Sequence, residues 1–134
     1  MRLKHINFVL LILAPLTLYA GTFEDAEAFR TEGNHREALT LYKQAADEAH
    51  PIANHWVGTY YKEGIIVEKN SKIAANYFLP AAALGVKGSM VYLANMYISG
   101  DGLPKDCAAA RYWIYKASSG NPATEWKEKL NNCE

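Results

Sequence analysis

The 134-residue chain has few side chains spaced for catalysis or metal binding. His50 and His55 are five residues apart with Pro51 between them, so they do not share a helical face, and His35 lies further away. The motifs His-Glu-x-x-His, Gly-x-Ser-x-Gly and Ser-x-x-Lys are absent, as is a glycine-rich phosphate loop. We therefore expect no metal site, no cofactor and no catalytic residue.

The two cysteines, Cys107 and Cys133, are the residues most suited to a covalent role. Cys107 should begin one predicted helix and Cys133 should follow the last one. If these helices form an antiparallel hairpin that turns near Gly120, both sulfurs lie at the same open end, which favours a disulfide in an exported protein. The alternative is two free thiols, as in a cytosolic protein. The spacing is not Cys-x-x-Cys, so a redox role is not expected.

Residues 1–20 have the layout of a secretory signal peptide. Arg2 and Lys4 give a basic start, residues 6–18 are almost all apolar, and Ala20 is a small residue at the expected cleavage point. The rival interpretation is an uncleaved membrane anchor, but a spanning helix needs about 20 apolar residues. We expect cleavage, a mature chain of residues 21–134 in the periplasm or secreted, and no stable membrane insertion afterwards.

The charge of the mature chain argues against nucleic acid as a partner. Loss of Arg2 and Lys4 reduces the 14 basic residues to 12, against 14 acidic residues, which leaves a net charge near −2. The charges are scattered along the chain, as on the solvated outer faces of helices.

A repeat of 36 residues organises the rest of the chain. Helix-capping residues, small residues and bulky residues all recur at this offset, and fixed periods of this kind indicate stacked helical hairpins. The matched sets are Asn34/Asn70/Asp106, Ala38/Ala74/Ala110, Tyr42/Phe78/Ile114, Ala45/Ala81/Ala117, Trp56/Tyr92, Tyr61/Tyr97 and Gly64/Gly100.

The pattern predicts seven helices in an all-α fold, over about 21–32, 35–49, 51–63, 71–84, 87–99, 107–118 and 123–131. We divide the mature chain into a leading unit (21–50), two repeats (51–86 and 87–122) and a closing helix (123–134). Bulky side chains such as Trp56, Phe78 and Tyr92 are expected to fill the spaces between layers.

The stretch from Leu93 to Asp106, with Tyr97, Gly100, Gly102 and Pro104 at fixed positions, resembles the Sel-one-like repeat, a relative of the tetratricopeptide repeats. The preceding unit resembles it less fully, because Ile66 stands in place of the second glycine. The resemblance implies a right-handed α-solenoid of stacked antiparallel hairpins that binds another protein, and bacterial members are often exported.

Two classes of function stay open on this basis. The first is an exported adaptor or scaffold, one version of which is an immunity protein that masks a toxin. The alternative is an enzyme directed at cell-wall or β-lactam compounds, against which the missing Ser-x-x-Lys motif counts.

The resemblance also implies which residues line the inner curve of the stack. The first helix of each hairpin should face this groove with the residues three before, one after and four after a small residue that contacts the second helix. Val91 and Ile98 are the expected central anchors, although they could instead simply pack between layers. The predicted partner-binding residues are His55, Thr59, Lys62, Val91, Asn95, Ile98 and, more weakly, Phe23, Glu27 and Arg30.

Overall fold

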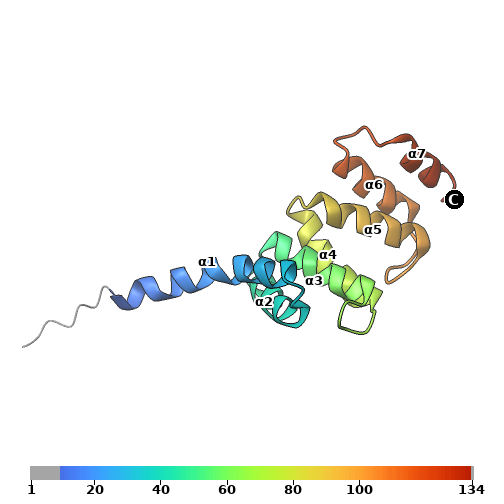
Figure 1. Ribbon diagram of the computed structural model, residues 1–134. Helices are drawn as coiled ribbons and strands as arrows, with labels where there is room; N and C mark the ends of the chain where they lie inside the picture. Colours follow the sequence, from blue (N-terminus) through green and yellow to red (C-terminus); the bar gives the residue numbers. More distant parts are fainter. Residues whose placement is uncertain (1–9, 134) are drawn as a thin grey trace, which may run out of the picture.

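The computed structural model describes residues 10–133 of the chain, and the side chains of residues 21–133. Within this range it contains only helices, which confirms the expected all-α fold (Figure 1). The seven helices are α1 (Leu10–Thr31), α2 (His35–Asp47), α3 (Pro51–Glu63), α4 (Ser71–Ala83), α5 (Lys87–Ser99), α6 (Cys107–Ala117) and α7 (Thr124–Asn131).

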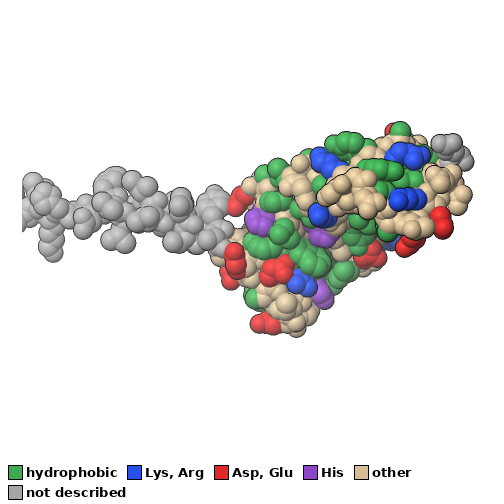
Figure 2. All heavy atoms as spheres, turned by 90° about the horizontal axis from the view of Figure 1, so that it is seen from above, with side chains coloured by type: hydrophobic (Ala, Val, Ile, Leu, Met, Phe, Trp, Pro, Cys, Tyr) green, Lys and Arg blue, Asp and Glu red, His purple; other side chains and the backbone are tan. Residues whose placement is uncertain are grey.

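The helices pair as antiparallel hairpins, α1 with α2, α3 with α4 and α5 with α6, and the hairpins stack into a solenoid with α7 at the far end (Figure 1). Residues that recur every 36 positions form the interior: Ala38, Ala74 and Ala110 are all completely buried. Small side chains at these points let the two helices of a hairpin approach closely. A single hairpin cannot bury both of its faces, so stacking completes the core. On the face drawn in Figure 2, charged side chains of both signs lie among other side chains.

Helix α1 differs from the expectation because it begins at Leu10 rather than near Gly21. Its first turns project away from the stack, while its last turns pack on α2 with Ala26 buried (Figure 1). Of the predicted signal peptide, residues 1–9 lie outside the described residues. None of the described helices is both long enough and apolar enough to span a membrane.

The expected helix caps are present at two of three positions. Asn70 accepts a hydrogen bond from the Ile73 amide at 2.9 Å, and Asp106 accepts one from the Ala109 amide at 3.0 Å. Asn34 precedes α2 but makes no side-chain capping bond. Instead, the side-chain amide of Asn34 donates to the Glu32 carboxylate at 3.2 Å.

The loops after α3 and α5 adopt left-handed backbone at equivalent positions, although only one of them holds a glycine. Gly102 has φ +79°, and Ile66 has φ +56°. A Cβ atom at Gly102 would lie 2.5 Å from the Ser71 backbone, which the loop touches at the start of α4. The absence of a side chain at Gly102 therefore lets this loop pack against the start of α4. The loop after α3 adopts the same left-handed conformation, although Ile66 replaces the glycine there.

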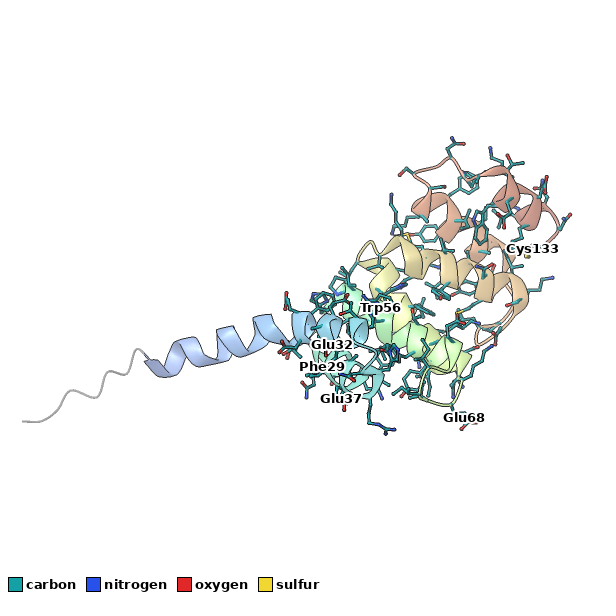
Figure 3. The ribbon with its side chains drawn as sticks, viewed as in Figure 1. Phe29, Glu32, Glu37, Trp56, Glu68 and Cys133 are labelled. Atoms are coloured by element: carbon teal, nitrogen blue, oxygen red, sulfur yellow. A yellow bond between two sulfur atoms is a disulfide. The ribbon has the colours of Figure 1, made fainter. Side chains whose placement is uncertain are left out.

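The expected Cys107–Cys133 disulfide is present, with the two Cα atoms 5.8 Å apart. Cys107 is the first residue of α6 and Cys133 follows the end of α7, so the bond ties the start of α6 to the end of α7 (Figure 3).

Candidate protein-binding surface

The predicted strip on α3 lies in the seam between α3 and α5. The Nδ1 atom of His55 is 2.8 Å from the hydroxyl of the fully buried Ser89 on α5. Thr59 is only 9 % exposed and donates to the His55 carbonyl at 2.9 Å. Lys62 forms an ion pair with Asp101 at 3.2 Å.

Close approach of α5 explains the environment of His55. A Cβ atom at Gly88 would lie 2.8 Å from the His55 Cε1 atom, so the glycine leaves room for the imidazole against the α5 backbone. Burial lowers the pKa of His55, because the charged imidazolium would lose its hydration there. His55 therefore joins two repeats through its contact with Ser89, in a site that disfavours its charged form.

The predicted strip on α5 is partly covered by α7. The Lys129 ammonium donates to the Asn95 side-chain oxygen at 3.3 Å. Val91 and Ile98 pack against an apolar cluster that includes Leu130 of α7. Both residues are only partly buried, and Val91 also lines a hollow beside Trp126 of α7, so their role as anchors stays a prediction.

The predicted residues of α1 also have partners within the chain. Phe23 stacks on His50 with 4.1 Å between ring centroids. Arg30 donates to Glu27 at 2.8 Å and to the hydroxyl of Tyr42 at 3.1 Å, and this hydroxyl donates to Glu27. Burial would raise the pKa of Glu27, but hydrogen bonds from Arg30 and Tyr42 outweigh it and hold the pKa below its usual value.

The nine predicted residues thus lie mainly along the contacts between successive hairpins, and their role in partner binding stays a prediction. The strips of α3 and α5 contact the following layer through His55, Lys62 and Asn95, and Arg30 of α1 contacts Trp56 of α3. Two large rings lie beside these residues, Trp56 and Tyr92, which the sequence analysis did not include among the partner-binding residues. Both pack against the core clusters, as expected, and both are also partly exposed.

Trp56 and Tyr92 belong to a row of contacting side chains that crosses the first helices of the three hairpins. The Arg30 guanidinium lies 4.3 Å from the Trp56 ring centroid, in a cation–π contact between α1 and α3. His55 follows, with its ring centroid 5.7 Å from that of Trp56 and 6.0 Å from that of Tyr92 on α5. We name Arg30, Trp56, His55 and Tyr92 the aromatic row.

All four members of the aromatic row are partly exposed. Polar and apolar groups both lie next to the row. The Tyr92 hydroxyl donates to Glu63 at 3.3 Å. Ile52, one helical turn before Trp56 on α3, is 45 % exposed. The signal that could have revealed the row is the match of Trp56 and Tyr92 at the 36-residue offset, one position after His55 and Val91.

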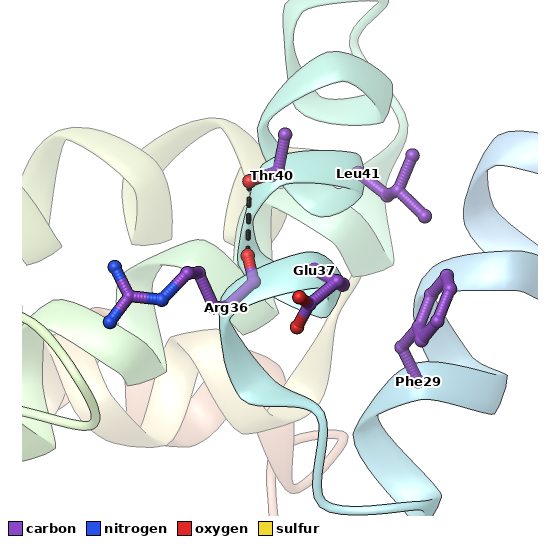
Figure 4. A pocket seen from close by; sticks show the side chains of 5 residues that line it. All are labelled: Phe29, Arg36, Glu37, Thr40 and Leu41. Carbon is purple, nitrogen blue, oxygen red and sulfur yellow. Dashed lines mark hydrogen bonds between the residues drawn. The ribbon is translucent and has the colours of Figure 1, made fainter.

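A separate hollow of about 350 Å³ lies at the α1–α2 end of the stack. Figure 4 shows Phe29 of α1 facing Leu41 of α2 across it, with Arg36, Glu37 and Thr40 on the α2 side. Its apolar lining is the kind of surface that a neighbouring hairpin covers inside a longer stack. Across the described residues, no group of three or more His, Cys, Asp or Glu side chains could hold a metal ion.

Comparison with solved structures supports the helical repeat fold. The chain is similar to a Sel1 repeat protein from Oxalobacter formigenes, with a TM-score of 0.74 and 24 % identity over 92 % of this chain and 95 % of that one. It is also similar to a protective antigen present in uropathogenic Escherichia coli strains. In that case the TM-score is 0.73 and the identity 26 %, over 81 % of this chain and 24 % of the antigen.

Among curated proteins, the chain is similar to chitin synthase regulatory factor 2 of Schizosaccharomyces pombe, with 36 % identity over 88 residues, which are 65 % of this chain. The chain spans only 17 % of the length of that relative. Sel1 repeats match residues 26–50, 51–86 and 88–122. Proteins with these repeats generally mediate protein–protein interactions as adaptors. Since the matches cover well over half of its length, the chain belongs to the Sel1 repeat family.

Proposed function

We propose that this protein is an exported adaptor that binds another protein through the aromatic row. The observation that carries the proposal is the continuous contact from Arg30 through Trp56 and His55 to Tyr92, across three hairpins. Tryptophan, tyrosine and arginine are the residue types that dominate binding energy at protein interfaces.

The row is suited to binding because its side chains are held in place before a partner arrives. Arg30 is fixed by Glu27 and Tyr42, His55 by Ser89, and Tyr92 stacks on Phe78 with 4.5 Å between ring centroids. Rings that are already ordered lose little conformational entropy on association. Glu27 and Glu63 beside the row would form part of a polar rim.

Export is part of the proposal. The basic start and apolar run of residues 1–20 support cleavage near Gly21, after which the part of α1 that packs on α2 would remain. The Cys107–Cys133 bond supports an oxidising compartment, the periplasm or the exterior, where such bonds persist.

A narrower form of the proposal is that the partner is a toxin and the protein masks it. A masking protein needs a rigid surface that is ready before contact, and the mutually supporting contacts of the aromatic row meet this requirement. The role proposed here requires no catalysis by this chain.

The experiment combines capture with matched surface variants. The tagged mature protein is used to capture a partner from periplasmic extract, the partner is identified by mass spectrometry, and its affinity is measured by calorimetry. Ile52→Glu introduces a charge one helical turn before Trp56 of the row. Leu84→Glu introduces the same charge at another exposed aliphatic residue, which follows α4 and is outside the row. We expect Ile52→Glu to weaken binding at least about tenfold and Leu84→Glu to leave it unchanged.

Trp56→Ser tests the row itself, after circular dichroism has shown that the fold survives. The proposal fails if the partner binds Ile52→Glu and Trp56→Ser with wild-type affinity while Leu84→Glu loses it. The narrower form would be supported if the partner is a toxin. This toxin should be inactive when bound to the wild type and active in the presence of Ile52→Glu.

A further inference from the structure

The outward side of α6 differs from the equivalent sides of α2 and α4. Tyr112 is 56 % exposed and Tyr115 is 40 % exposed. At the 36-residue offset, Tyr112 corresponds to Asn76 of α4 and Thr40 of α2, both exposed polar residues. Packing of the repeats therefore does not require an aromatic residue at the position of Tyr112, and its exposed ring calls for another explanation.

The exposed ring of Tyr112 is held by its neighbours on α6. Tyr112 meets Trp113 edge-on with 5.0 Å between ring centroids, and the Lys116 ammonium donates to the Tyr112 hydroxyl at 3.3 Å. A shallow hollow of about 320 Å³ opens between them, lined by Ala108, Arg111, Tyr112 and Tyr115. The small side chain of Ala108 leaves room for a side chain from outside.

The charge around this hollow is basic. Arg111 and Lys116 lie on α6, and the helical segments of α4, α5 and α6 contain no acidic residue. Among the described residues, neither Arg111 nor Lys116 forms an ion pair. Unpaired cations beside exposed rings complement a carboxylate-rich surface.

We propose that the outward face of α6, defined as Ala108, Arg111, Tyr112, Tyr115 and Lys116, binds an acidic segment of another protein. Carboxylates of the segment pair with Arg111, whose planar guanidinium can hold one with two hydrogen bonds, and with Lys116. An apolar side chain of the segment enters the hollow over Ala108 between the two tyrosine rings. This face is on a second helix, separate from the aromatic row, so it goes beyond the function proposed above. It supplies the second surface that an adaptor needs to join two proteins.

The test uses two fluorescein-labelled peptides that differ only in charge. One has glutamates around a leucine and a phenylalanine, and the other has glutamine at every glutamate. Fluorescence anisotropy with the full mature protein should show the acidic peptide binding at least about tenfold tighter, with an affinity that falls as salt rises. Arg111→Gln and Tyr112→Ser should each weaken it by at least about fivefold. Lys127→Gln on α7, an exposed basic residue away from this face, is the matched control and should change it by less than about twofold.

Three results would overturn the proposal. The first is equal binding of both peptides, or none up to about 1 mM. The second is wild-type binding by both Arg111→Gln and Tyr115→Ser, two exposed substitutions that should not disturb the core. The third is that light scattering detects a dimer and that Tyr112→Ser converts it to a monomer, because a second copy of the chain would then occupy this face. Ile52→Glu should leave peptide binding unchanged, so failure here is distinguishable from failure of the aromatic row.

Discussion

Removal of the Cys107–Cys133 bond should loosen α7 from α6 before the rest of the solenoid unfolds. The two cysteines are 26 residues apart in the chain, and loop-closure entropy for a loop of this length corresponds to about 3.5 kcal/mol at 25 °C. In a domain of this size, such a loss lowers the melting temperature by roughly 10–15 °C.

The structure explains why the loss should be local. Helix α7 has only eight residues, fewer than the roughly 12 that an isolated helix needs, and Leu130 is its one fully buried apolar anchor. In a stack whose repeats contact only their neighbours, the end unit can detach by itself. Unfolding should therefore begin with a step that removes about a tenth of the helical signal.

The assay compares the Cys107→Ser/Cys133→Ser double variant with the oxidised and the reduced wild type. Thermal melts followed by circular dichroism give the midpoint, and hydrogen exchange of residues 124–131 reports fraying. The double variant and the reduced wild type should behave alike, because both lack only the cross-link. If the double variant melts with the oxidised wild type and α7 keeps its protection, the loop-closure reasoning is wrong.

Further predictions concern the loops, pH and export. Gly102→Ala should lower the free energy of unfolding, measured by urea titration, by at least about 2 kcal/mol, because the alanine would need a left-handed backbone and would clash with the Ser71 backbone. Ile66→Gly at the equivalent turn should change the free energy of unfolding by less than about 1 kcal/mol. The pKa of His55 is lowered from 6.5 by burial, so its contribution to stability is present above pH 6.5 and is lost as the pH falls towards the folded-state value. The urea midpoint should therefore drop on acidification from neutral pH to pH 5, and less so in His55→Gln. If the urea midpoint of His55→Gln falls with pH as steeply as that of the wild type, the effect belongs to another group. Intact-mass analysis of the fractionated protein should find a chain beginning near Gly21; a membrane-bound chain that retains residues 1–20 would contradict this. A chromogenic β-lactam should not be turned over, and measurable turnover would revive the enzymatic alternative.

The sequence by itself determined the repeat, the helices and the interior of each hairpin. Ala38, Ala74 and Ala110 recur every 36 residues, and all three are buried against the partner helix. Such burial depends on spacing along a helix, which the order of residues displays directly. The Cys107–Cys133 bond was predictable for the same reason, because a short antiparallel hairpin brings its two ends together whatever the rest of the stack does.

Only the tertiary structure decided which side chains of the first helices face outward. Trp56 and Tyr92 pack against the core clusters, yet stacking of α1, α3 and α5 also leaves both partly exposed in one row. Val91 and Ile98 are partly exposed too, and they pack against the cluster that includes Leu130 of α7. Exposure on a first helix depends on the rotation between successive hairpins. That rotation is set by contacts such as His55 with Ser89, 34 residues apart, which no local pattern reports.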